Sequence, residues 1–581
     1  MTRRRQSTTN SQKSRYRYPT PKSRVATSFT LLLTALRPAS PSFTRYESYP
    51  PYCSTPTAMS ERHIPPLKSD LQSTHLLQVN AIIRHGARTP FTSELHCWDD
   101  DALRTTNTTT PSNDDDDDDD EWDCRLTTLM SPPKPQDGAM FLFEKKYDAL
   151  RPPQGNLLGG SCELGQLLHD GYDQELFNGN VLRRAYLESD NNLFLYKGLP
   201  EDLVPYDPSL LYFRGDDQQR TLMSGQVLIR GLFGEEIREK SNEGDVLISV
   251  HTSDKTMDVL VPNAKICPRL DDLKEEAEGS NDFQEVMKSE EVKELEEVLK
   301  GVGTNGGERW QPVDIIHECL MTTMCTDRSL PEVLDDYGTE GGIFARMTDF
   351  STWKLFFKYF YNNAAFAKLA MGPLWAELLD KMLLTYNIED HLEKDREAPR
   401  MVLYSGHDNT IMPLLASLDF PFDYLPWTPY ASMFIIEVHA ILDEKKNPNY
   451  TSGRAFRLLY NGDVLTSKIP NCPPHDDLCD LQYLVQLVEP FATRDRDCDS
   501  VKNAAPAQSM TVTRTWLLGV VLSASLVTSL FTVLVTVWFV RRRMKITQRE
   551  GLFLTVDMGE YGSAGNGYEE DTTKEYEFNI S

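Results

Sequence analysis

Two short histidine motifs carry the side chains best suited to chemistry in this 581-residue chain. The first, in LLQVNAIIRHGARTPF, surrounds a histidine with two arginines (Arg84, His85 and Arg88) at the end of an apolar run. The second, in RMVLYSGHD, ends in His407 and Asp408. Clustered cations at the end of a buried strand are costly unless an anion binds there. In a chain of formal net charge −27, this clustering indicates a local anion site, and phosphate fits it best.

Two predicted strands, 77–83 and 401–405, would bring these motifs together. Each apolar run ends in a glycine-bearing turn with a histidine. Ligands of open parallel sheets bind at the carboxyl ends of the strands, so neighbouring strands would place both histidines at one edge. Thr89 and Pro90 favour a helix start after the first turn, and a helix N-terminus adds donors for an anion.

With further segments, these motifs resemble the histidine acid phosphatase family, the acid phosphatase branch of the histidine phosphatases. LYFRGDDQQRTLMSGQ (211–226) is similar to the family segment that holds a third phosphate-binding arginine. Similar family segments are found at 165–186, 250–270 and 429–438. The resemblance covers about residues 76–490 in collinear order.

The resemblance implies hydrolysis of phosphate monoesters through a covalent phosphohistidine. It implies that His85 is the nucleophile, that Asp408 is the proton donor, and that the phosphate is bound by Arg84, Arg88, Arg220 and His407. Neighbouring cations would keep His85 neutral. A carboxylic acid that must be protonated would fit an acidic optimum. No metal or cofactor is expected. The alternatives are an inositol-polyphosphate (phytase-like) phosphatase, a mutase, or a catalytically silent anion-binding receptor. The aspartate after His407 argues against the mutase.

The expected fold is α/β, with a central mixed, mainly parallel sheet flanked by helices and a smaller, mostly helical cap. The core is expected at residues 71–255 and 385–490 and the cap at 256–384. A leader and linker would occupy 1–70. The acidic low-complexity insertion 105–123 reads as a solvated loop, which could border the site and repel polyanionic substrates. Family members often dimerise, so a homodimer is possible.

The C-terminal region predicts a membrane anchor. Residues 516–540 contain no charged side chain. This uncharged segment is long enough to span a bilayer. The basic run 541–545 follows and indicates a cytosolic tail, 541–581, with a juxtamembrane stalk at 491–515. The bulk of the chain would then be lumenal or extracellular, in an endosomal or lysosomal membrane or the plasma membrane. A weak apolar segment at 25–40 is expected to be a signal peptide; a transit peptide or a start at Met59 are the alternatives.

Cysteines and sequons agree with a secretory route. All ten cysteines precede the predicted membrane segment, which suits disulfides; Cys319 with Cys325 and Cys472 with Cys479 are close enough for local bonds. Asn107 and Asn449 begin glycosylation sequons.

Other charged residues and histidines carry smaller expectations. The acidic excess argues against a nucleic-acid partner. Arg214 and Asp217 are expected to form a structural ion pair. The remaining histidines considered are expected to be ordinary core or surface residues: His63, His169, His251, His317 and His475.

Overall fold

The computed structural model describes most of the chain between residues 43 and 500. The described residues are 43–67, 74–90, 124, 129–130, 143–144, 162–188, 211–233, 248–254, 256–299, 313–387, 399–420, 427–441, 450–500, 534–538 and 541. Several predicted features lie outside them: the signal segment, the insertion 105–123, both sequon asparagines and the helix expected after Pro90.

An eight-stranded sheet organises the molecule. Its order is β10-β8-β7-β1-β6-β4-β5, with β9 paired to β8. The strands are β1 (Thr74–Arg84), β4 (Leu211–Gly215), β5 (Val250–His251), β6 (Met401–Gly406), β7 (Met433–Ile441), β8 (Arg454–Tyr460), β9 (Asp463–Val464) and β10 (Cys479–Asp480). A separate two-stranded sheet pairs β2 (Leu129–Met130) with β3 (Phe143–Glu144).

The prediction of a mixed sheet is confirmed, but "mainly parallel" is wrong. The pairings β1–β6, β6–β4 and β4–β5 are parallel, whereas β1–β7, β7–β8, β8–β9 and β8–β10 are antiparallel. Strands β7 and β8 are buried along their whole length. A strand buried on both faces has a continuous apolar sequence, which is typical of parallel strands. The sequences of β7 and β8 therefore did not reveal that these strands pair antiparallel.

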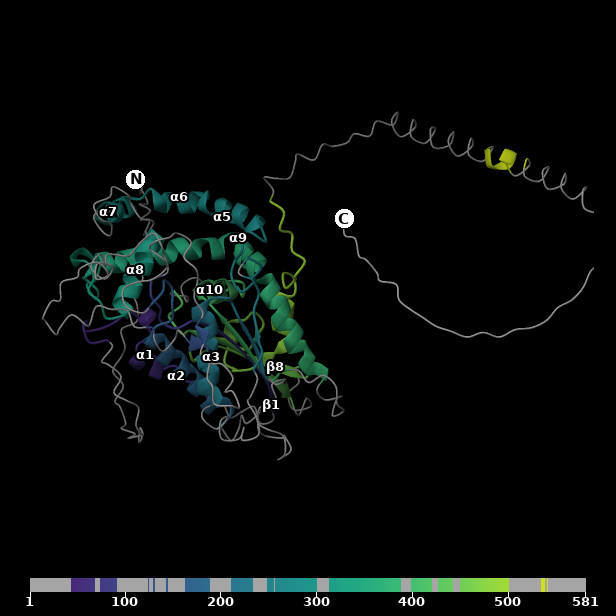
Figure 1. The fold of residues 1–581 in the computed structure, drawn as a ribbon, viewed down its shortest axis with the longest axis horizontal. Helices are drawn as coiled ribbons and strands as arrows, with labels where there is room; N and C mark the ends of the chain where they lie inside the picture. Colours follow the sequence, from purple (N-terminus) through teal and green to yellow (C-terminus); the bar gives the residue numbers. More distant parts are fainter. Residues whose placement is uncertain are drawn as a thin grey trace, which may run out of the picture. The chain divides into compact units, whose positions relative to one another are not determined.

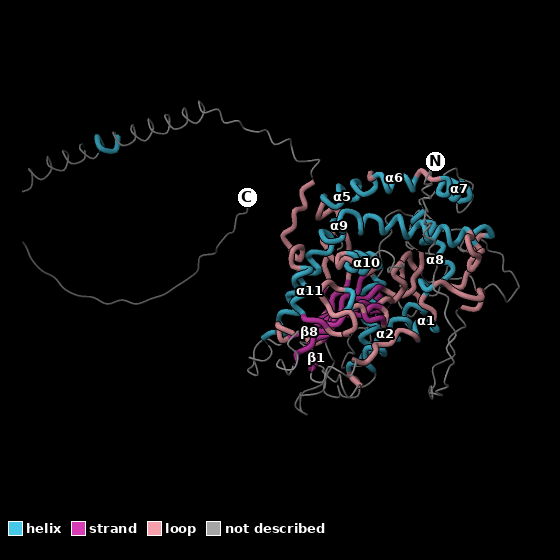
Figure 2. Tube along the Cα trace, turned by 180° about the vertical axis from the view of Figure 1, so that it is seen from behind, coloured by secondary structure: helices cyan, strands magenta, loops and turns pink. Residues whose placement is uncertain are grey.

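Helices cover both faces of the sheet (Figure 2). On one face, α2 (His169–Tyr186) and α3 (Gln219–Phe233) share a core with Val79, Ala81 and Ile83 of β1. Ile82 points to the opposite face, as strand alternation requires, and packs with α9 (Ile343–Leu383), α10 (Asp408–Ala416) and α11 (Leu481–Val488). This three-layer arrangement fixes the ends of β1 and β6 between buried layers.

The described residues between 256 and 384 are mainly helical. They form α5 (Arg269–Glu278), α6 (Asn281–Met287), α7 (Glu290–Leu299), α8 (Val313–Cys325), the short η5 (Glu332–Leu334) and the long α9, followed by η6 (Leu384–Asn387). Figure 1 shows α5, α6 and α7 lying along α9. The C-terminal half of α9 packs in the sheet core from Phe366 to Met382. This half of α9 is therefore part of the helical layer on that face of the sheet, and the cap boundary at 384 stays a prediction.

The N-terminal segment 43–64 differs from the predicted linker. It contains η1 (Pro51–Cys53) and α1 (Pro56–Ser60), and Tyr52 and Cys53 are buried in a cluster with α7, α8 and the start of α9. Asp327 anchors the segment, accepting hydrogen bonds from the backbone amides of Thr44 and Arg45. Pro- and Ser-rich composition predicted a linker, but long-range contacts that composition does not encode hold this segment in place.

Four disulfides have both partners described: Cys53–Cys325, Cys124–Cys162, Cys267–Cys498 and Cys472–Cys479. The predicted local bond between Cys472 and Cys479 is confirmed. The predicted Cys319–Cys325 bond is wrong, because Cys325 pairs with Cys53, 272 positions away in sequence. Cys319 and Cys325 both lie on α8, whereas Cys53 lies in the N-terminal segment, which packs against this helix.

The chain divides into two compact units, Met1–Asn503 and Ala504–Ser581. In the second unit the described residues, 534–538 and 541, are helical. No helix among the described residues is long and apolar enough to span a bilayer, and most of the predicted span 516–540 lies outside them.

Candidate active site

The two histidine motifs meet at the carboxyl ends of adjacent parallel strands. Strands β1 and β6 pair in register from Val79 opposite Met401 to Arg84 opposite Gly406. His85 follows β1 and His407 follows β6, and their ring centroids lie 5.2 Å apart. The juxtaposition predicted from the two strand ends is confirmed.

The turn after β1 depends on close contact with α2. A Cβ on Gly86 would lie 2.3 Å from the carbonyl oxygen of Gly171, so only glycine fits. The backbone N–H of Ala87 donates to the Gln174 side chain at 2.9 Å, which fixes the turn. Gly171 and Gln174 of the 165–186 segment therefore hold the turn of the first histidine motif in place.

His85 is held in one tautomer. Its Nδ1 lies 2.8 Å from the carbonyl oxygen of Gly86. A carbonyl only accepts, so Nδ1 carries the proton and Nε2 keeps a lone pair. Burial lowers the pKa of His85 well below its usual range, and the charges of Arg220, Arg84 and Arg88 and the neighbouring His407 lower it further. Burial, with the nearby cations adding to it, therefore favours a neutral imidazole.

Arg84 is immobilised on every side. Its side chain is fully buried, with the guanidinium carbon 4.6 Å from the ring centroid of Tyr52 and 4.4 Å from that of Tyr430. One nitrogen donates to the Tyr52 hydroxyl at 2.6 Å and lies 3.1 Å from the Asp408 carboxylate; another donates to the Thr428 carbonyl. This arginine is a preorganised charge.

Arg88 and Arg220 also act on His85 through their charges. Arg88 forms an ion pair with Glu318 of α8 at 2.9 Å, and Arg220, at the start of α3, donates to the Gly165 carbonyl at 3.3 Å. Burial and the like charge of Arg88 lower the pKa of Arg220 to about 9. Two neighbouring buried guanidinium groups favour an anion between them.

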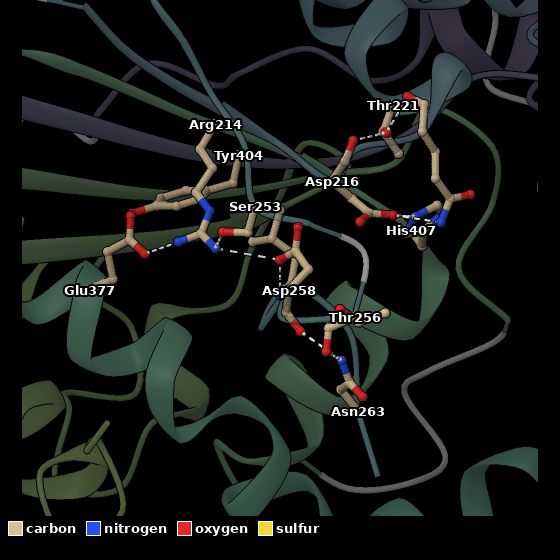
Figure 3. A network of polar contacts seen from close by, with 12 residues as sticks. Arg214, Asp216, Thr221, Ser253, Thr256, Asp258, Asn263, Glu377, Tyr404 and His407 are labelled. Atoms are coloured by element: carbon tan, nitrogen blue, oxygen red, sulfur yellow. Dashed lines mark hydrogen bonds and ion pairs between the residues drawn. The ribbon is translucent and has the colours of Figure 1, made fainter. Parts of the chain in front are cut away.

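His407 is oriented by Asp216. Its Nε2 donates to the Asp216 carboxylate at 2.7 Å (Figure 3). Burial lowers the pKa of His407, although this hydrogen bond opposes the shift. Burial raises the pKa of the neighbouring Asp258 carboxyl group to about 6, with the charge of Asp216 contributing.

Arg214 is a structural cation, but not with the predicted partner. It pairs with Glu377 of α9 and with Asp258, 3.4 Å away, and donates to Ser253 at 3.3 Å (Figure 3). The expected pair with Asp217 is not formed among these contacts, because β4 directs Arg214 towards α9 while the turn after β4 brings Asp216 to His407.

Asp408 begins α10 at the opening of the site. Its side chain is 21% exposed, whereas that of Arg84 is 0% exposed. Trp427 donates its indole N–H to Asp408 at 2.9 Å. Burial would raise the pKa of Asp408, but Arg84 and the Trp427 hydrogen bond outweigh it and lower the pKa to about 2. This environment favours the carboxylate form of Asp408 in the unliganded site, whereas its predicted role as proton donor requires the protonated form.

Several side chains at the site were not singled out from the sequence. Asp216, Glu318, Tyr52 and Trp427 all contact a motif residue. Asp216 lies within the third-arginine segment 211–226 and so offered a local signal; the others come from distant segments and offered none. His317 stacks on Trp427 with ring centroids 4.2 Å apart, and burial lowers its pKa to about 3, so it is a neutral packing residue beside the site.

Comparison with known proteins agrees with this geometry. Residues 75–461 match the family model described as histidine phosphatase superfamily (branch 2). Counting factor 60 of Dictyostelium discoideum is 25% identical over 400 residues, covering 68% of this chain and 82% of that protein. Lysophosphatidic acid phosphatase type 6 of Mus musculus is 24% identical over 445 residues, covering 75% and 90%. Lysosomal acid phosphatase of Homo sapiens is 26% identical over 348 residues, covering 59% and 74%.

A solved structure, the apo form of Bifidobacterium longum multiple inositol polyphosphate phosphatase, is similar with a TM-score of 0.44 and 13% identity, covering 77% of this chain and 98% of that one. The family match spans both histidine motifs and the third-arginine segment. The chain belongs to branch 2 of the histidine phosphatase superfamily.

Proposed function

We propose that this protein is an acid phosphatase that hydrolyses phosphate monoesters through a phosphohistidine on His85. The observation that carries the proposal is the fixed tautomer of His85, whose Nδ1–H is held by the Gly86 carbonyl so that Nε2 is the nucleophile. Its neutral state, which attack requires, is supported by the lowered pKa. Relatives named as acid phosphatases support the same reaction class.

In the first step, the phosphoryl oxygens bind to Arg84, Arg88, Arg220 and His407. The lone pair of His85 Nε2 attacks phosphorus while the ester P–O bond breaks, and the arginines stabilise the charge of the transferring group. The leaving oxygen takes a proton from Asp408.

The proton on Asp408 must come from the substrate. Asp408 has a pKa of about 2, so it is ionised in the free enzyme at mildly acidic pH. A phosphate monoester keeps one proton below its second pKa of about 6. The monoanion brings that proton, which passes to Asp408 and then to the leaving oxygen. The protein is an acid phosphatase, on this reasoning, because its substrate must be protonated.

In the second step, water attacks the phosphohistidine. Asp408, now a carboxylate, accepts a proton from that water as its oxygen bonds to phosphorus. The P–N bond breaks, the electron pair returns to Nε2, and inorganic phosphate leaves. His85 is again neutral and Asp408 holds the proton that the departing phosphate removes.

For location, we propose a single-pass type I membrane protein with the site on the lumenal or extracellular side. The uncharged segment 516–540 and the basic run 541–545 support the anchor and its orientation. Disulfides such as Cys53–Cys325 support an oxidising compartment. The relative named lysosomal acid phosphatase fits an endosomal or lysosomal membrane, with the plasma membrane as the alternative. A homodimer stays a prediction.

The test is hydrolysis of an aryl phosphate by the full-length protein in detergent, from acidic to neutral pH, with and without EDTA. We expect an acidic optimum, no effect of EDTA, and loss of activity in His85→Ala. His475→Ala, an exposed histidine, is the matched control and should retain activity. A folded wild type without activity, or an active His85→Ala variant, would contradict the proposal.

A further inference from the structure

Glu318 places a carboxylate against the phosphate-binding arginines. It comes from α8, far from the strand ends that carry the motifs, and its carboxylate lies 2.9 Å from Arg88. Its charge also acts on Arg220. The Glu318 side chain is 16% exposed and that of Arg88 is 9% exposed, so both members of the pair are largely buried.

The described charges of the site balance before any substrate binds. Arg84 faces Asp408 at 3.1 Å, Arg88 faces Glu318, and the charge of Asp216 acts on Arg220. Both histidines have lowered pKa values and add no positive charge. One phosphoryl group can still bind through directed hydrogen bonds, but its arrival makes the site net negative.

The proposed proton donor lies beside two aromatic rings. The proton donor Asp408 receives the Trp427 indole N–H, and Trp427 stacks on the neutral His317 of the same helix as Glu318. We call the two partly exposed carboxylates Asp408 and Glu318, whose side chains are 21% and 16% exposed, the acidic rim. A second phosphate on a substrate whose leaving oxygen is protonated by Asp408 would lie close to this carboxylate.

We propose that Glu318 sets the substrate class: the site accepts monoesters whose leaving group carries no further phosphate and repels inositol polyphosphates. This proposal rests on the function proposed above. Like charges a few ångströms apart in a partly screened site repel strongly enough to lower kcat/KM on the order of tenfold. The acidic rim therefore disfavours the phytase-like alternative.

The experiment compares kcat/KM for phenyl phosphate and for myo-inositol hexakisphosphate in the full-length protein and in Glu318→Gln. Glutamine keeps an oxygen acceptor for Arg88 and removes the charge. We expect the variant to raise kcat/KM for the hexakisphosphate by on the order of tenfold and to change that for phenyl phosphate much less. Glu290→Gln, which removes an exposed carboxylate of α7 (84% exposed), should leave both values unchanged.

Salt provides a second measurement that needs no variant. Electrostatic rejection weakens as ionic strength rises, so the wild-type preference for phenyl phosphate should shrink with added salt and should shrink less in Glu318→Gln. Equal changes for both substrates in the variant, or a wild type that prefers the hexakisphosphate, would overturn the proposal while leaving the phosphatase function in place. Failure to hydrolyse either substrate would overturn both.

Discussion

Replacing Trp427 by phenylalanine should move the acid side of the pH profile of kcat/KM and leave its alkaline side in place. The indole N–H donates to the Asp408 carboxylate at 2.9 Å. A hydrogen bond to a charged acceptor contributes about 1.5–3 kcal/mol, and one pKa unit corresponds to about 1.36 kcal/mol. The change should raise the pKa of Asp408 from about 2 by about one to two units, while a phenyl ring still packs on His317.

The shape of the profile follows from which species must be protonated. The pH dependence of kcat/KM reports the free enzyme and the free substrate. If one proton is shared between Asp408 and the ester, the rate is level between the pKa of Asp408 and the ester's second pKa of about 6. Raising the pKa of Asp408 therefore shortens the pH range over which kcat/KM is constant, because the acid end of that range moves to higher pH. The alkaline fall belongs to the ester and should follow the second pKa of whichever ester is used.

The assay measures kcat/KM against pH for two aryl monoesters with different second pKa values, in wild type and Trp427→Phe. Trp353→Phe, a tryptophan that packs against Phe283, controls for loss of an indole elsewhere. The reasoning would be refuted if kcat/KM fell at the same alkaline pH for both esters, or if that pH changed in Trp427→Phe. Either result would mean that a group of the enzyme, and not the ester, causes the alkaline fall.

Three further predictions concern the fold and the phosphate pocket. His85→Ala should lower kcat by at least about 10⁴-fold without changing the unfolding midpoint, and alkaline quenching with phosphate-labelled substrate, which preserves the acid-labile P–N bond, should trap phosphoenzyme only in the wild type. Asp216→Asn should weaken inhibition by inorganic phosphate by about 10–100-fold, since His407 loses a charged hydrogen-bond partner; an unchanged inhibition constant would mean that Asp216 does not support phosphate binding. Cys53→Ser with Cys325→Ser opens a loop of 272 residues and should lower the free energy of unfolding in urea by about 2–5 kcal/mol; coincident urea curves would contradict this.

The sequence predicts the part of the site that depends on local structure. Strand ends carry His85 and His407 because β1 and β6 are apolar runs that stop at a turn, and a parallel pairing then brings the two residues together. In the 165–186 segment, Gly171 allows the close contact with Gly86, and Gln174 accepts a hydrogen bond from the turn. Arg84, Arg88 and Arg220 all act electrostatically on His85, and their binding of phosphate stays a prediction.

The remaining part depends on contacts between distant segments. Tyr52 covers Arg84 from a segment whose composition predicted a linker, and Glu318 reaches Arg88 from a helix with no motif. The pKa of Asp408 could not be predicted from residue type, because it is set by the balance of burial against Arg84 and Trp427. Arg214 shows the same limit: the ion pair was expected, but the choice of Glu377 over Asp217 depends on how α9 lies across the sheet.

The Cys53–Cys325 bond has a consequence for how the protein matures. Contacts that span hundreds of residues form late, because the entropy of closing long loops must be overcome before they stabilise the chain. The pocket around Arg84 and Arg88 needs the N-terminal segment, α8 and both strand ends at once. Catalytic competence should therefore appear only at the end of oxidative folding, after the chain has passed through species that expose the apolar faces of β1 and α8. Enzymatic activity would then report correct cysteine pairing as well as the chemistry of the site.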